Sequence, residues 1–317
     1  MSELFLAIVL LLIVLYLPYL FKTIKLKKIK ESDIPGEGSW AKLKDGHIYY
    51  RWFYPKDNGN GETIVLVHGF STPSFVWGGL IDNFCQSGFK VLVYDHFGRG
   101  FSERPAINYD KELYVRSLKD LIDDQGLGNK IHLIGYSMGG PIVGYFTENY
   151  PELTKTISLI APAGFMQRMS GVNSWTTKPI IGEWFWHVFS HKIYGVGRMS
   201  ETSYSEDPLS INEDEFLENF NKQLVFRGFT ESLLSTVRNF NLFDCRRMYK
   251  GIGSLNIPTF VAWGKVDGVV PYSGSKNLKE CIPHAELLTI KEGTHDITYR
   301  QPSEVGEAIK NFLLSNS

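Results

Sequence analysis

Residues 131–141 read IHLIGYSMGGP. The first four form a short, β-branched apolar run, which predicts a buried strand, and a helical pattern starts near Pro141. Between them, Gly135 and Gly139 flank Ser137 at two positions on either side. A sharp strand-to-helix turn requires this spacing, because it strains the central residue and leaves no room for side chains two positions away. The pattern therefore predicts that the Ser137 hydroxyl is held out for nucleophilic attack.

Similar apolar runs occur on both sides of this turn, and each one is followed by a loop and, for most of them, a helical pattern. They cover residues 63–67, 90–94, 156–160, 259–263 and 285–290, and a hairpin at 41–43 and 47–54 precedes them. Strands that alternate with helices in this way predict a doubly wound α/β fold. We expect a mostly parallel central sheet with helices on both faces and functional residues at the carboxyl ends of the strands.

Composition excludes several classes of function. The chain has 317 residues, 43% of them hydrophobic, and a formal net charge of −1. This charge gives no global electrostatic attraction to nucleic acid, so we expect no nucleic-acid partner. None of the three cysteines, Cys85, Cys245 and Cys281, belongs to a CxxC pair, and HExxH is absent. We therefore expect no disulfide framework, no metal site and no cofactor. The oligomeric state stays open.

The N-terminus carries a candidate membrane anchor. Residues 4–21 carry no charged side chain. As a helix this segment is about 27 Å long, close to the thickness of a thin hydrocarbon layer. A cleaved signal peptide is the alternative, but Glu3 stands where a basic leader is expected. Five lysines follow the run, between Lys22 and Lys30. By the positive-inside rule they predict a retained single-pass anchor with the catalytic domain in the cytoplasm.

The alternation of strands and helices stops after residue 165 and resumes near residue 246. The stretch between reads as helical pieces rich in aromatic residues, which indicates a cap inserted into the sheet domain. We predict four regions: residues 1–30 as anchor and basic flank, 31–165 as the first part of the core, 166–245 as the helical cap, and 246–317 as the second part of the core.

A serine nucleophile needs a base, and the base needs an acid to orient it. Asp267 follows the strand at 259–263, and His295 follows the strand that ends at Ile290. Both lie just past the carboxyl end of a predicted strand, as Ser137 does. We therefore predict that Ser137, Asp267 and His295 form a catalytic triad.

The sequence His68-Gly69-Phe70, which follows the first central strand, predicts an oxyanion hole. A tight glycine turn allows the backbone to approach, so that the amide groups of Phe70 and Met138 face a developing oxyanion. His68 is an alternative base, but a histidine before the turn is expected to brace the loop. The Gly-rich stretch 95–102 lacks both phosphate-binding patterns, so we interpret it as a structural turn.

Five ordered motifs resemble those of the α/β-hydrolase superfamily over about residues 40–315. They are HGF (68–70), DxxGxGxS (95–102), GYSMGG (135–140), WGxxDxxxP (263–271) and GTH (293–295). The resemblance implies Ser137 as nucleophile, His295 as base and Asp267 as its orienting acid. It also implies Phe70 and Met138 as oxyanion donors.

Within this superfamily, an apolar N-terminal anchor before this core is similar to the membrane-bound monoacylglycerol lipases. The resemblance implies a membrane-anchored esterase acting on a lipid or another hydrophobic ester. Three alternatives stay open: a carbon–carbon hydrolase like the meta-cleavage-product hydrolases, which share GxSMGG, an amide hydrolase, and a non-catalytic membrane-tethered scaffold. Four aromatic residues of the cap are predicted to bind substrate: Trp184, Phe185, Trp186 and Phe189.

Overall fold

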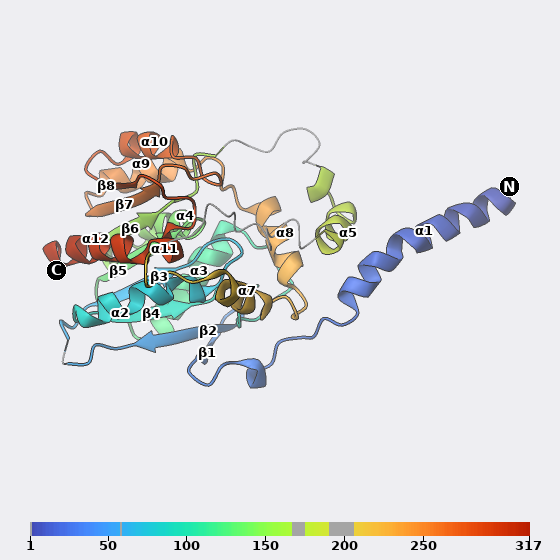
Figure 1. Cartoon of the computed structure of the whole chain (residues 1–317), viewed down its shortest axis with the longest axis horizontal. Coiled ribbons are helices and arrows are strands. Elements are labelled where there is room, and N and C mark those ends of the chain that lie inside the picture. Colours follow the sequence, from blue (N-terminus) through green and yellow to red (C-terminus); the bar gives the residue numbers. More distant parts are fainter. Residues whose placement is uncertain (1, 58, 167–174, 190–205) are drawn as a thin grey trace.

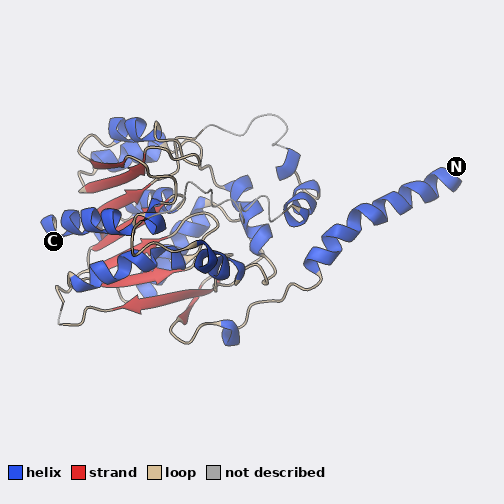
Figure 2. Ribbon diagram, in the orientation of Figure 1, coloured by secondary structure: helices blue, strands red, loops and turns tan. Residues whose placement is uncertain are grey.

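A central sheet organises the protein. The computed structural model describes residues 2–57, 59–166, 175–189 and 206–317. Its eight-stranded sheet has the order β1-β2-β4-β3-β5-β6-β7-β8 (Figure 1), and its strands are drawn in red in Figure 2. The predicted hairpin forms β1 (Ser39–Leu43) and β2 (Gly46–Phe53), which pair antiparallel, and β2 pairs antiparallel with β4 (Lys90–Tyr94).

The strands from β4 to β8 in the sheet order are parallel to their neighbours. Besides β4, they are β3 (Thr63–Val67), β5 (Ile131–Tyr136), β6 (Thr154–Ile160), β7 (Thr259–Gly264) and β8 (Glu286–Ile290). Every residue of β3, β5 and β7 is buried, as expected for strands covered on both faces. The carboxyl ends of these strands share one edge of the sheet, so the loops with the candidate residues meet there.

Helices cover both faces of the sheet (Figure 1). On one face pack α2 (Gly78–Gln86), α11 (Ile297–Arg300) and α12 (Pro302–Ser315). On the other pack α3 (Lys111–Asp124), α4 (Gly139–Asn149), α9 (Arg246–Ser254) and α10 (Gly274–Cys281). Short 3₁₀ turns are η1 (Glu31–Asp33), η2 (Ser74–Trp77) and η3 (Pro151–Leu153). The predicted doubly wound α/β fold is confirmed.

Among the described residues, three further helices lie between β6 and α9, in the stretch predicted as the cap. They are α5 (Ile181–Val188), α7 (Glu213–Asn221) and α8 (Phe229–Asn239). They share a small apolar cluster of their own, made of Trp186, Phe220, Phe229, Leu233 and Leu234. Phe70 of the predicted oxyanion loop packs against this cluster, so the cap touches the loops at the edge of the sheet.

The N-terminal helix α1 (Ser2–Thr23) projects away from the sheet domain, and the C-terminus lies at the opposite end of the molecule (Figure 1). Its segment Glu3–Thr23 is long and apolar enough to cross a membrane, and none of its residues is fully buried. Length and composition alone also fit a signal sequence.

Candidate active site

Ser137 lies in the turn between β5 and α4, in a left-handed backbone conformation with φ at 54°. This conformation is rare for a residue with a side chain and persists only where the surroundings hold it. The flanking glycines permit it. A Cβ on Gly135 would lie 2.5 Å from the carbonyl oxygen of Gly139, and a Cβ on Gly139 would lie 2.0 Å from that of Val67. The turn therefore presents the Ser137 side chain at the edge of the sheet.

The structure brings the three predicted triad side chains into one hydrogen-bonded chain. Nε2 of His295 lies 3.0 Å from Oγ of Ser137, and Nδ1 of His295 lies 2.8 Å from Oδ2 of Asp267. Ser137 and His295 are 158 residues apart in sequence. All three residues are buried, so these hydrogen bonds are shielded from bulk water.

The orientation of His295 is set by Asp267. The second carboxylate oxygen of Asp267, Oδ1, accepts the amide N–H groups of Val269 and Val270, each at 2.8 Å. These bonds fix the carboxylate, and the ring of Tyr136 packs on the imidazole at a centroid distance of 5.2 Å. A carboxylate facing Nδ1 favours the tautomer with its hydrogen there, which leaves Nε2 free to take a proton from Ser137.

Two backbone amides are available as oxyanion donors. The N–H groups of Phe70 and Met138 have no hydrogen-bond partner within the described part of the chain. Both residues line the same cavity as Ser137. Met138 also directly precedes α4, whose N-terminus adds partial positive charge. The two amides predicted from the sequence therefore lie beside the predicted nucleophile.

The buried Arg99 positions the oxyanion loop, and sequence reasoning missed it. Its Nε donates to the carbonyl oxygen of Phe70 at 2.7 Å. Its two terminal nitrogens donate to Ser232 Oγ and Thr236 Oγ1 of the cap helix α8, at 2.8 and 3.0 Å. Arg99 is fully buried, and its guanidinium group donates to carbonyl and hydroxyl oxygens. Its donors therefore serve to join the loop to the cap.

We expect Arg99→Lys to lower kcat about 10-fold with little change in KM. Lysine keeps the charge but loses the planar fork that holds Phe70 and the cap at once. The oxyanion donor binds only the transition state, so displacing it lowers kcat and leaves KM nearly unchanged. Complete loss of one donor costs about 10²–10³ in kcat, and a displacement costs less. Steady-state kinetics on a soluble ester measures the effect. Arg104→Lys is the matched control, because Arg104 is half-buried in the same region but donates to the carbonyl oxygens of Gly100 and Ser102 instead.

His68 is not a base in this site. The ring is fully buried, and its Nε2 accepts the amide N–H of His96 at 2.9 Å. Burial holds the pKa of His68 well below its usual value and lowers the pKa of His96 to about 3. Both rings are therefore neutral and brace the loop after β3, as the sequence suggested.

An apolar cavity of about 180 Å³ opens over Ser137. Its lining comprises Phe70, Ser137, Met138, Ala163, Met166, Val237, Phe240, Leu242, Phe243, Val269 and Val270. Val237 belongs to the cap helix α8, and the other residues come from loops of the core and the cap. A cavity lined in this way has the shape and chemistry to hold an apolar group beside the serine hydroxyl.

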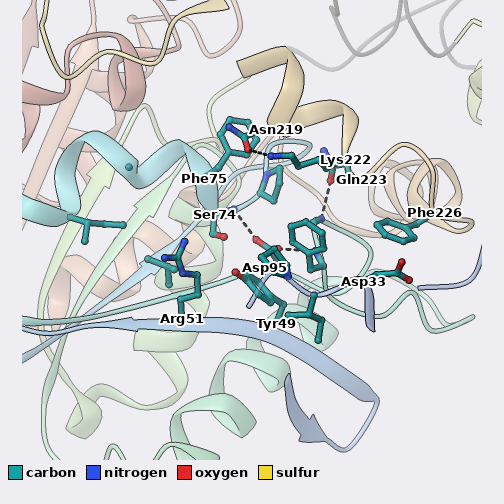
Figure 3. A pocket seen from close by; sticks show the side chains of 18 of the residues that line it. Asp33, Tyr49, Arg51, Ser74, Phe75, Asp95, Asn219, Lys222, Gln223 and Phe226 are labelled. Atoms are coloured by element: carbon teal, nitrogen blue, oxygen red, sulfur yellow. Dashed lines mark hydrogen bonds between the residues drawn. The ribbon is translucent and has the colours of Figure 1, made fainter. Parts of the chain in front are cut away.

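A larger cavity of about 820 Å³ lies elsewhere and contains none of the triad residues (Figure 3). Asp95 on its lining accepts the amide N–H groups of Ser74 and Phe101, at 2.8 and 2.9 Å. The Gly-rich loop is thus closed by its own hydrogen bonds, as expected of a structural turn.

Across residues 2–57, 59–166, 175–189 and 206–317, no cluster of His, Cys, Asp and Glu is arranged to hold a metal ion.

The four cap aromatics predicted to bind substrate do not line the cavity over Ser137. Trp186 is buried in the apolar cluster of the cap. Phe185 and Phe189 contact each other at a ring distance of 4.9 Å. Trp184 donates its indole N–H to the carbonyl oxygen of Leu15 in α1, at 2.6 Å. Their role in substrate binding stays a prediction.

Comparison with known proteins gives the family. The family model described as serine aminopeptidase, S33, matches residues 60–301, about three quarters of the chain. The chain belongs to this hydrolase family. Lipase 3 of Moraxella sp. (strain TA144) is 26% identical over 252 residues, which cover 75% of this chain and 73% of that protein. A monoacylglycerol lipase of Xenopus laevis is 22% identical over 272 residues, covering 81% and 77%.

Other similar proteins carry different names. A 2-hydroxy-6-oxononadienedioate/2-hydroxy-6-oxononatrienedioate hydrolase of Klebsiella pneumoniae is 26% identical over 268 residues, covering 81% of this chain and 89% of that protein. Among solved structures, one described as a membrane phospholipase A superposes with a TM-score of 0.70 at 18% identity, covering 100% of this chain and 99% of that one. The hydrolase is therefore an α/β-hydrolase, and its substrate is not decided by these relatives.

Proposed function

We propose that the hydrolase is a membrane-anchored serine esterase that cleaves lipid esters of the monoacylglycerol type through an acyl-enzyme. The observation that carries the proposal is the hydrogen-bonded chain Ser137–His295–Asp267 beneath an apolar cavity. The hydrogen-bonded chain supplies an activated nucleophile for acyl transfer, and the cavity takes the acyl chain of an ester.

The reaction has two halves. Ser137 Oγ attacks the ester carbonyl while His295 Nε2 takes its proton, and the amides of Phe70 and Met138 bind the oxyanion. His295 then gives the proton to the leaving alcohol, and the acyl group stays on the serine. A water molecule, deprotonated by His295, attacks the acyl-enzyme; His295 then returns this proton to Oγ of Ser137 as the bond to the acyl group breaks and the fatty acid leaves. Asp267 accepts the hydrogen bond from Nδ1 of His295 and stabilises the imidazolium in both halves.

The anchor is part of this proposal. The apolar segment Glu3–Thr23 is followed by lysines at positions 22, 25, 27, 28 and 30, a flank that favours retention with the catalytic domain in the cytoplasm. The superposition on a membrane phospholipase A extends over the whole chain, α1 included. An anchored enzyme meets its substrate in the bilayer, which agrees with the apolar cavity.

Hydrolysis assays with a substrate panel test the reaction type. Full-length protein in detergent receives a monoacylglycerol, a matched fatty-acid amide, a short-chain ester and a vinylogous 1,5-diketone with a scissile carbon–carbon bond. We expect the monoacylglycerol to have the highest kcat/KM, with release of free fatty acid. Preference for the amide or the diketone would instead support one of the alternatives kept open above, and no turnover of any substrate would support the scaffold.

We expect Leu242→Trp to shift the acyl-chain preference toward short chains. The larger side chain fills part of the cavity over Ser137, so kcat/KM falls roughly 10-fold or more for long-chain esters relative to short ones. Leu224→Trp is the control, since Leu224 packs on the cap cluster and does not line the cavity. An equal loss on both chain lengths would show that the cavity does not hold the acyl chain.

A further inference from the structure

The cap helix α5 packs directly on the candidate anchor α1. Besides the hydrogen bond from Trp184 to Leu15, the ring of His187 meets the ring of Tyr19 edge-on, at 5.2 Å and 89°. Leu15 and Tyr19 are four residues apart, and Trp184 and His187 are three apart. Because such spacings place residues on one side of a helix, one face of α5 lies along one face of α1.

This contact lies within the apolar span. Leu15 stands eight residues before Thr23, which is about 12 Å along the helix axis at 1.5 Å per residue. The hydrocarbon core of a bilayer is about 30 Å thick, and the lysine flank starts only at Lys22. If α1 spans the bilayer, a helix that touches it at Leu15 lies below the level of the lysine flank.

The surface of α5 fits that depth. Ile180, directly before the helix, is 84% exposed and Ile181 is 48% exposed, although both are large and apolar. The polar groups of α5 point the other way, since Glu183 pairs with Arg238 and His187 contacts Glu231, both on α8. An apolar surface directed away from the protein, with the carboxylate of Glu183 paired to Arg238 on the inner side, is the pattern of a helix lying in a membrane interface.

We propose that α5 is embedded in the interface of the bilayer beside α1, with Ile180 and Ile181 among the lipid acyl chains. The inference rests on the proposed anchoring. At eight residues, α5 is too short to span a membrane, so it lies along the surface layer. It contacts α8, whose Val237 lines the cavity over Ser137. The part of the cap that touches lipid is thus one helix away from the acyl cavity.

Fluorescence quenching in vesicles tests this placement. Cys85 is first replaced by alanine so that the label does not react there, because Cys85 is the most accessible of the three cysteines and the other two are buried. An environment-sensitive fluorophore is attached to Ile181→Cys, to Leu12→Cys in the apolar span, or to Leu314→Cys. Leu314 is the matched control, because it is 46% exposed and lies in α12 at the far end of the molecule (Figure 1). Each protein is reconstituted in phosphatidylcholine vesicles with lipid-borne doxyl quenchers or aqueous iodide.

We expect the fluorescence emission of the label at position 181 to shift to shorter wavelength. Doxyl lipids should quench this emission and iodide should not. The label at position 12 should behave in the same way, and the label at position 314 should not. Iodide access at position 181 with lipid contact at position 12 would overturn the inference and leave the anchoring intact. Protection of position 181 from both quenchers would also overturn it, by showing that protein covers the face. No lipid contact at position 12 would refute the anchoring itself.

A functional readout complements the quenching. Ile181→Glu places a charge on the proposed lipid face, and the exposure of Ile181 keeps the change outside the packed core. We expect a severalfold loss of activity on long-chain ester in vesicles and none on a dissolved short-chain ester, whereas Leu314→Glu changes neither. An unchanged rate on the vesicle substrate would contradict the proposal.

Discussion

Replacing Ser137 by alanine is expected to lower ester hydrolysis by about 10⁶-fold. The change removes the oxygen that lies 3.0 Å from Nε2 of His295, so no acyl-enzyme forms. Binding and the oxyanion amides still act on a water-mediated reaction, which leaves a residual rate about 10³–10⁴ above that in water. The same variant is expected to lose all labelling by a fluorophosphonate probe, which reacts with activated serines.

Ser158→Ala provides the matched control for that experiment. Ser158 is buried in β6, the strand next to β5, and its hydroxyl has no partner within the described residues. Its removal is expected to leave labelling and hydrolysis at wild-type levels. Labelling that survives in Ser137→Ala would place the nucleophile elsewhere. A folded wild-type protein that never labels would favour the non-catalytic scaffold.

The sheet and the proximity of the triad could be predicted because both depend on local sequence. Central strands such as β3 are short and apolar throughout, so their period and length show in the sequence. The Gly135 and Gly139 pair marks a turn that other residues cannot make. Once Ser137, Asp267 and His295 each follow a parallel strand, the topology alone brings them to one edge.

The contacts of the cap could not be predicted in the same way, because they join residues far apart in the chain. Arg99 and Thr236 are 137 residues apart, and Trp184 and Leu15 are 169 apart. Helical periodicity shows that Trp184 belongs to an apolar face of its helix that must pack on something, but it does not identify the element that packs there. The aromatic residues of α5 therefore suggested substrate contacts, whereas Trp184 packs on α1.

Asp267→Asn is expected to lower kcat by about 10⁴-fold while the fold stays intact. The asparagine oxygen still accepts the amides of Val269 and Val270, so the loop keeps its shape. Its NH₂ group then faces Nδ1 of His295, and an N–H cannot accept a hydrogen bond from another N–H. The imidazole therefore adopts the tautomer with its hydrogen on Nε2, which is unable to take the proton of Ser137.

Kinetics of Asp267→Asn beside Asp296→Asn separate this tautomer effect from a general loss of charge near the imidazole. Asp296 is adjacent to His295 in sequence, and its carboxylate accepts the hydroxyl of Tyr299 at 2.7 Å, a bond that asparagine keeps. We expect Asp296→Asn to retain activity within a few-fold of wild type, because it keeps the bond to Tyr299 and leaves Nδ1 of His295 facing Asp267. If both variants lost activity equally, negative charge near the histidine would matter and its tautomer would not. If Asp267→Asn retained more than about a tenth of the activity, Asp267 would not orient the base, since a wrong tautomer costs far more than that.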